Sequence, residues 1–252
     1  MHTFELMLDS ISIEIRYDFG HLYFDRCGLC MVDIEKQCEG WVTGQIDPKS
    51  GQISKPENGY SVMFNNGQFN FGAVKAFKQG TANIAKEASS IWKIVQANLG
   101  LEVFTRLGCR MTYCLPALSI EDAEKRLAKS QLTVTIPDAM NSKYAIRNRI
   151  MVVVLSAGET EYRLELKVVT RLEGVQPSSL MMTEPRLLSK RQREIRIIQQ
   201  KKLEEYNAQP MYAISLDIDC VQLHPENIAL EGFVTDQAVV VERDFVPLLR
   251  DL

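Results

Sequence analysis

Residues 144–172 read YAIRNRIMVVVLSAGETEYRLELKVVTRL. The two halves of this stretch, 144–155 and 161–172, are rich in β-branched and long apolar residues, which favour strands. A glycine-containing loop, Ser156 to Thr160, lies between them and is typical of a hairpin. The stretch therefore predicts two antiparallel strands. Its most apolar run, Ile150 to Leu155, is far shorter than the roughly 20 residues that cross a bilayer, so we predict a buried strand there.

Further strands are predicted on both sides of this hairpin. Near the N-terminus, Ile11, Ile13 and Ile15 alternate with polar residues, which places them on one face of a strand within residues 3–17. Turn sequences at 47–51, 57–59 and 65–67 predict short antiparallel strands between them. Strands are also predicted over 101–114 and 211–221.

Helical periodicity is clear in other segments. Apolar residues repeat at three- and four-residue steps over 81–99, and Gly100 is a typical residue to end that helix. Segment 22–37 shows no clear period and contains Gly28, so a strand followed by a short turn of helix is predicted there. The remaining helices are predicted from Ser119 as N-cap, over 189–206 and over 236–250.

Strands and helices occur in runs, which favours an α+β fold with mainly antiparallel sheets and three to five helices over a doubly wound sheet. Two organisations stay open at this point. Residues 1–176 could form an α+β lobe with a hairpin-rich sheet, joined at a hinge near 174–185 to a lobe of residues 177–252 that holds a basic helix, a strand and the C-terminal element. Alternatively, the chain forms one domain throughout.

The composition is that of a globular protein, with 46% hydrophobic and 24% charged residues. The net charge of −3 excludes a whole-molecule attraction to nucleic acid or anionic lipid. Glu5 and Asp9 interrupt any apolar run that a signal peptide would need, and six cysteines show no disulfide-type spacing. We therefore expect a cytoplasmic protein without membrane association.

A cysteine pair separated by two residues is the first candidate site. Cys27 and Cys30 have the spacing of metal ligands, and Cys38 with His21 would complete a set of four. The competing interpretation is that these cysteines are small apolar side chains of the core, because a second pair of ligands is missing.

Four charged residues on two strands form the second candidate site. Asp217 and Asp219 share a face of one strand and are suited to Mg²⁺, while Arg106 and Arg110 share a face of another and are suited to a carboxylate or phosphate. The competing interpretation is that the arginines neutralise structural carboxylates such as Asp217 and Asp219.

Basic residues concentrate on the helix predicted over 189–206, which is suited to phosphates or an acidic partner. The competing interpretation is a solvated face balanced by nearby glutamates. The candidate binding residues are Lys190, Arg191, Arg193, Arg196, Lys201 and Lys202.

Common catalytic and nucleotide-binding motifs are missing from the sequence. The three histidines are far apart, there is no Gly-x-Ser-x-Gly elbow, and no glycine-rich phosphate loop precedes a helix. We therefore expect no cofactor.

The stretch FTRLGCRMTY at 104–113 resembles an uncharacterised, sporadically distributed bacterial family with an Arg-aliphatic-Gly-aliphatic-Arg-Tyr strand after a long helix. LDID at 216–219 and FVTD at 233–236 are similar to that family's Leu-Asp-x-Asp strand and late Ile-Thr-Asp. Tyr113 departs from the pattern, since it follows Arg110 by three residues. The resemblance implies a two-lobed bacterial α+β protein without an assigned activity.

Two functions follow from these features. The first is a noncatalytic binding or assembly protein of the bacterial cytosol, which engages a protein partner, a second copy of the chain or nucleic acid through the basic helix. The alternative is a metal-dependent phosphoryl-transfer or nuclease-like enzyme that uses Asp217 and Asp219 with Arg106 or Arg110.

Overall fold

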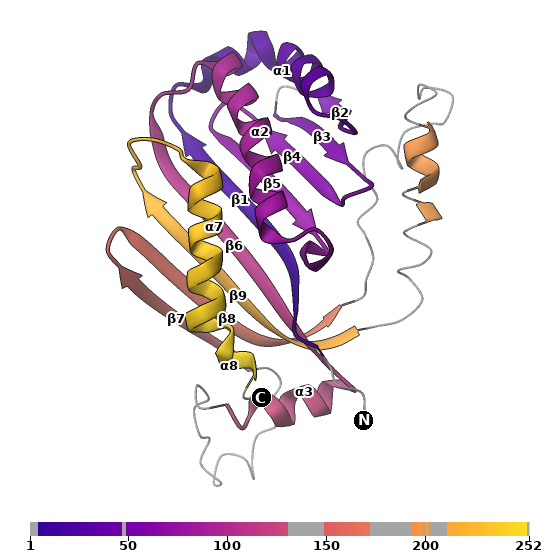
Figure 1. Cartoon of the computed structure of the whole chain (residues 1–252), viewed down its shortest axis with the longest axis vertical. Helices are drawn as coiled ribbons and strands as arrows, with labels where there is room; N and C mark the ends of the chain where they lie inside the picture. Colours follow the sequence, from indigo (N-terminus) through magenta and orange to yellow (C-terminus); the bar gives the residue numbers. More distant parts are fainter. Residues whose placement is uncertain are drawn as a thin grey trace.

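The computed structural model describes residues 5–46, 49–130, 149–171, 193–198, 200–201, 211–250 and 252. Within them, nine strands form one sheet in the order β2-β3-β4-β5-β1-β6-β9-β8-β7, and all paired strands are antiparallel (Figure 1). The predicted α+β class with mainly antiparallel sheet is confirmed. The strands are β1 (Met7–Tyr17), β2 (Val42–Ile46), β3 (Gly51–Lys55), β4 (Tyr60–Phe64), β5 (Gln68–Val74), β6 (Phe104–Ala117), β7 (Ile150–Ala157), β8 (Thr160–Arg171) and β9 (Met211–Leu223).

One face of this sheet is covered by the three helices α1, α2 and α7, whose bounds are given below. Figure 1 shows α2 and α7 lying across the strands, and α2 contacts both α1 and α7. The helices are α1 (Tyr23–Gln37), α2 (Thr81–Leu99), α3 (Ile120–Leu127), α7 (Leu230–Val240) and α8 (Pro247–Arg250), with shorter turns η1 (Gly20–Leu22), η2 (Ala76–Lys78) and η4 (Val241–Phe245). In the part of the chain that the structure describes, no helix is both long and apolar enough to cross a membrane.

Strand β1 lies at the centre of the sheet and shows why the core forms on one side. Ile11, Ile13 and Ile15 are buried, as their alternation predicts, while Ser12 between them and Arg16 after them are exposed. The isoleucines belong to a core that also includes Trp92 of α2, which is buried as well. Because side chains alternate along a strand, the opposite face of the sheet receives the polar residues.

Most predicted elements are found. The turns at 57–59 and 65–67 separate β3, β4 and β5, and the hairpin of β7 and β8 turns at Gly158, whose φ is 61°. Helix α2 ends at Gly100 in the left-handed region, and the Ser119 side chain accepts a hydrogen bond from the backbone N–H of Asp122. Strand β9 confirms the strand predicted over 211–221. It pairs with both β6 and β8, so the C-terminal part of the chain completes the same sheet.

Segment 22–37 corrects one prediction, because it forms helix α1 over nearly its whole length. Tyr23, Cys27 and Ile34 are buried at helical spacing. The periodicity is obscured by apolar residues on the solvent side, Phe24 and Leu29 among them, which are exposed. Gly28 does not interrupt the helix, because packing of the buried face outweighs its low intrinsic propensity.

Strand β7 corrects a second prediction. The run Ile150 to Leu155 belongs to one of the two edge strands of the sheet in the described part of the chain, and its side chains are largely exposed. A continuous apolar run is typical of a strand covered on both faces, but here it lies at an edge.

The C-terminal segment is helical, as predicted over 236–250, but with different limits. Helix α7 begins at Leu230 and is followed by the π-helical turn η4 and by α8. The helix begins before the predicted residue 236, and two of these additional residues, Leu230 and Phe233, are buried in the core. The predicted hinge at 174–185 lies outside the described residues.

The close packing around Gly20, next to the end of β1, can be tested with two glycine substitutions. A Cβ atom at Gly20 would lie against the backbone carbonyl of Asn66 and 2.9 Å from Cε2 of Tyr17, whose hydroxyl donates to two nearby carbonyls. We expect Gly20→Ala to lower the free energy of unfolding by about 1–3 kcal/mol. Gly28→Ala is the control: it has no atom within 4 Å of its Cβ position and should raise stability by about 0.5–1 kcal/mol. Urea denaturation measures both, and equal effects would contradict the described packing.

Candidate functional site

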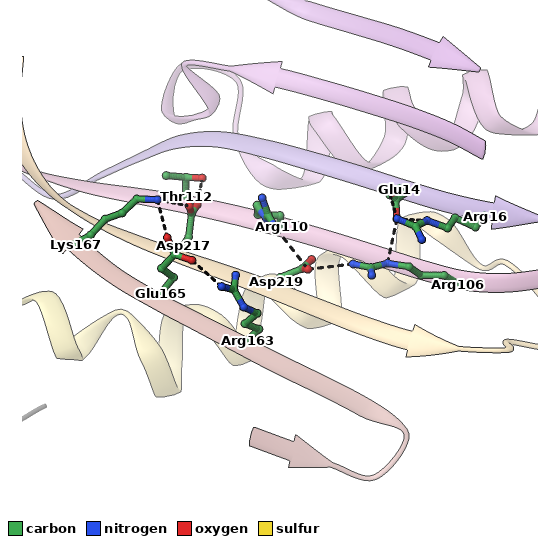
Figure 2. A network of polar contacts seen from close by, with 10 residues as sticks. All are labelled: Glu14, Arg16, Arg106, Arg110, Thr112, Arg163, Glu165, Lys167, Asp217 and Asp219. Carbon is green, nitrogen blue, oxygen red and sulfur yellow. Dashed lines mark hydrogen bonds and ion pairs between the residues drawn. The ribbon is translucent and has the colours of Figure 1, made fainter. Parts of the chain in front are cut away.

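Charged side chains form a row across four neighbouring strands, β1, β6, β9 and β8, on the sheet face turned away from α1, α2 and α7 (Figure 2). Each strand contributes alternate residues, so the period-two geometry of the sheet collects them on one surface. We call this set the charged row; it consists of Glu14, Arg16, Arg106, Arg110, Arg163, Glu165, Lys167, Asp217 and Asp219.

Asp219 of β9 lies at the centre of the charged row. The register places it opposite Arg110 of β6 on one side and opposite Arg163 of β8 on the other. Its Oδ2 accepts a hydrogen bond from a terminal nitrogen of Arg106 at 3.0 Å, and a terminal nitrogen of Arg110 lies 3.7 Å away. The carboxylate of Asp219 therefore pairs with two guanidinium groups.

Glu14 of β1 extends the charged row in one direction. Its Oε1 lies 2.8 Å from Nε of Arg16 and 3.1 Å from Nε of Arg106. Arg106 therefore bridges two carboxylates on different strands, Glu14 on β1 and Asp219 on β9 (Figure 2). This bridge ties β1 to β9 across the intervening strand β6.

Glu165 of β8 extends the charged row in the other direction. It accepts hydrogen bonds from Lys167 at 2.7 Å and from Arg163 at 2.8 Å. On the adjacent strand, Asp217 accepts a hydrogen bond from the Thr112 hydroxyl at 2.5 Å, and its other oxygen lies 3.9 Å from Nζ of Lys167. Asp217 is therefore held by a hydroxyl and an ammonium group.

Hydrogen bonding lowers the pKa of Glu165. The bond from Lys167 is the main cause, and the bond from Arg163 and the positive charges of both residues act in the same direction, while partial burial opposes them. The carboxylate is thus stabilised in its charged form by cations on its own strand.

The charged row is layered, with the cations further out than the carboxylates. The side chains of Arg16, Arg110 and Arg163 are 51%, 49% and 42% exposed. All four carboxylates lie between 15% and 24%. Five cations and four carboxylates nearly cancel, but the groups that reach solvent are mainly guanidinium groups.

Comparison with family models and with curated proteins gives no match for this chain. The resemblance to the bacterial family carried by residues 104–113 therefore stays a prediction.

The structure brings together the four residues of the predicted phosphoryl-transfer site. Arg106, Arg110, Asp217 and Asp219 lie on the same sheet face. Asp219 faces the two arginines, whereas Asp217 contacts Thr112 and Lys167. Among the residues that the structure describes, no three or more His, Cys, Asp or Glu side chains are grouped so that they could hold a metal ion.

The candidate metal ligands Cys27 and Cys30 are one helical turn apart on α1 and buried, and Cys38 follows the helix and is partly buried. Burial is the main reason that the pKa of Cys30 rises to about 12, with the nearby Cys27 as a smaller cause. Cys27 and Cys30 both belong to the hydrophobic core.

The predicted basic helix is described only in part. Residues 193–198 are helical and form the short orange helix of Figure 1, and residues 200–201 are helical as well. Arg193 and Lys201 are exposed and Arg196 is partly buried. Ile198 is 37% exposed. Three of the candidate binding residues, Lys190, Arg191 and Lys202, lie outside the described residues.

Sequence reasoning missed five members of the charged row: Glu14, Arg16, Arg163, Glu165 and Lys167. The signal was the alternation of charged and leucine residues over 163–167, which reads RLELK. The alternation indicates that Arg163, Glu165 and Lys167 share one face of their strand. Which residues they contact depends on the strands that lie beside it, and this stretch does not encode the order of the strands.

Loss of the central carboxylate should weaken the fold. Asp219→Asn removes the negative charge between Arg106 and Arg110, so we expect the free energy of unfolding to fall by about 1–3 kcal/mol. The control, Arg16→Gln, removes a half-exposed charge at the end of the charged row and should change stability by less than about 0.5 kcal/mol. Urea denaturation at low salt measures both, and an equally small effect of Asp219→Asn would show that the charged row does not hold the strands.

The lowered pKa of Glu165 makes part of the stability depend on pH. Its ordinary pKa is 4.5, and the folded value is lower. The stabilisation is therefore complete above about pH 4.5 and is lost as the pH falls through the folded pKa. We expect wild type to exceed Glu165→Gln in unfolding free energy near pH 7 and the difference to shrink towards pH 3. Glu161→Gln, which removes a charge from an exposed position of the same strand, is the matched control.

Proposed function

We propose that this chain is a noncatalytic binding or assembly protein, and that its charged row binds an acidic segment of a partner protein. The layering of the charged row carries this proposal: carboxylates lie beneath, and Arg16, Arg110 and Arg163 extend towards solvent. Arginine is enriched at protein interfaces because its planar group binds carboxylates through two parallel hydrogen bonds.

The balance of charges favours a protein over nucleic acid as the partner. Nucleic-acid affinity depends on cations that are free to replace the counterions of many phosphates. In the charged row, Arg106 and Lys167 are engaged by carboxylates, and the excess is one cation. Such a surface suits short-range pairing with a few carboxylates, and its own carboxylates repel a uniformly charged polyanion.

The alternative, a metal-dependent phosphoryl-transfer enzyme, receives less support from the same residues. A Mg²⁺ ion at Asp219 would compete with two guanidinium groups, and one at Asp217 would compete with the Thr112 hydroxyl and Lys167. An open strand face also lacks the enclosure in which catalytic groups converge on a substrate.

An acidic peptide tests this proposal. We expect a fluorescent peptide of about 20 residues, in which about five glutamates are spaced among glycine and serine, to bind. Arg16→Glu combined with Arg110→Glu should weaken binding about a hundredfold or more, because two charged hydrogen bonds of about 1.5 kcal/mol each are lost. Fluorescence anisotropy at several salt concentrations measures the affinity. The control is Lys86→Glu with Lys93→Glu, which makes the same charge change on the exposed side of α2 and should leave binding unchanged.

Three results of this comparison would contradict the proposal, and a fourth comes from the basic helix described below. The first is no binding of the peptide, and the second is an equal loss in the control variant. The third is tighter binding of a single-stranded DNA or RNA oligonucleotide of equal charge, which would indicate a nucleic-acid surface.

The basic helix over 189–206 stays a separate predicted contact. Arg193→Glu combined with Arg196→Glu in the same assay distinguishes it from the charged row. A loss of binding confined to this variant would assign the acidic partner to the helix.

A further inference from the structure

The outer edge of β7 is apolar on both sheet faces. Ile150, Val152 and Val154 lie on the face of the charged row, because the register places them opposite Lys167, Glu165 and Arg163. Val152 and Val154 are 47% and 56% exposed. Edge strands of monomeric proteins are usually protected by lysine, proline or a bulge. Residues 150–157 read IMVVVLSA and contain neither lysine nor proline, nor any other charged residue.

Half of the backbone polar groups of β7 point outward. The two-residue turn after β7 makes Ala157 and Thr160 a hydrogen-bonded pair, and hydrogen-bonded pairs then recur at every second residue towards Met151. The backbone N–H and C=O groups of the residues in between face away from β8. These outward residues are Ile150, Val152, Val154 and Ser156, and no strand among the described residues pairs with them.

The other face of β7 borders an apolar cavity of about 330 Å³. Met151, Val153 and Leu155 line it from the strand, and Phe245 and Leu248 line it from η4 and α8. Figure 1 shows that α7 does not extend over β7. An added strand beside β7 would bring side chains to this cavity.

We propose that β7 pairs antiparallel with β7 of a second copy of this chain, so that the two sheets join into one. The two-fold axis passes through Val153. This register places Val152 opposite Val154 of the copy and Ile150 opposite Ser156, so all outward backbone groups of β7 form hydrogen bonds, about eight in total. On the cavity side, Met151 meets Leu155 of the copy, and Val153 meets Val153.

The residues of β7 indicate that the partner at this sheet edge is β7 of a second copy of the chain. The edge requires an extended, uncharged segment with apolar residues on both faces, and β7 itself is such a segment. Antiparallel self-pairing brings the same patch of both copies together, as in an isologous dimer. Since β7 has no charge, no like charges meet across the axis. This inference does not depend on an acidic partner of the charged row.

Two double variants, both at Val152 and Val154, test the pairing and its register. Val152→Lys with Val154→Lys places lysines opposite one another across the axis, and should convert the dimer to monomer. Val152→Lys with Val154→Glu uses the same positions but places opposite charges across the axis, and should retain the dimer. Light scattering after size exclusion measures the mass at up to about 200 µM protein, a range that detects micromolar affinity. Circular dichroism confirms that each variant is folded.

The outcomes separate the proposal from other assemblies. A monomeric wild type at all concentrations overturns it, as does a dimer that survives the two lysines. If the lysine–glutamate variant is also monomeric, the register at Val153 is wrong. A cysteine variant gives an independent measurement: Val153→Cys should form a disulfide-linked dimer under mild oxidation, whereas Val154→Cys, whose side chain faces Val152 of the copy, should not.

Discussion

The antiparallel register of β1 between β5 and β6 is the constraint on which the rest of the structure depends. It directs Ile11, Ile13 and Ile15 towards the helices and leaves Glu14 and Arg16 on the other face. Because side chains alternate along a strand, a slip of one residue would exchange the two sets and bury charges in the core. The pairing that builds the hydrophobic core therefore also builds the charged row.

Most groups of the charged row are paired with one another. Asp219 and Glu165 are each held by two cations, and Arg106 joins two carboxylates on different strands. Such mutual pairing fixes the side chains without a large desolvation cost, because the groups stay partly solvated. The outermost groups of this network are guanidinium groups, and the proposed binding of an acidic segment depends on them.

The two proposed surfaces are compatible on one sheet. An axis through Val153 normal to the sheet would leave the charged rows of both copies on the same face of a continuous sheet. The contact at β7 is apolar and the charged row begins at β8, so the two surfaces would adjoin without overlapping. An acidic segment of sufficient length could then contact two charged rows, which increases avidity.

The sequence by itself determined the α+β class, the β7–β8 hairpin, helix α2 with its end at Gly100, and the face shared by Arg106 and Arg110. These features depend on short-range periodicity and on turn residues, which the local sequence encodes. The sequence did not determine that segment 22–37 is helical throughout, because exposed apolar residues such as Phe24 and Leu29 obscure the helical periodicity. Only the tertiary structure decided that Asp219 lies between two arginines and that β7 lies at the edge. The reason is that strand order depends on contacts between residues far apart in the chain, and the residues of one strand do not specify which strands lie beside it.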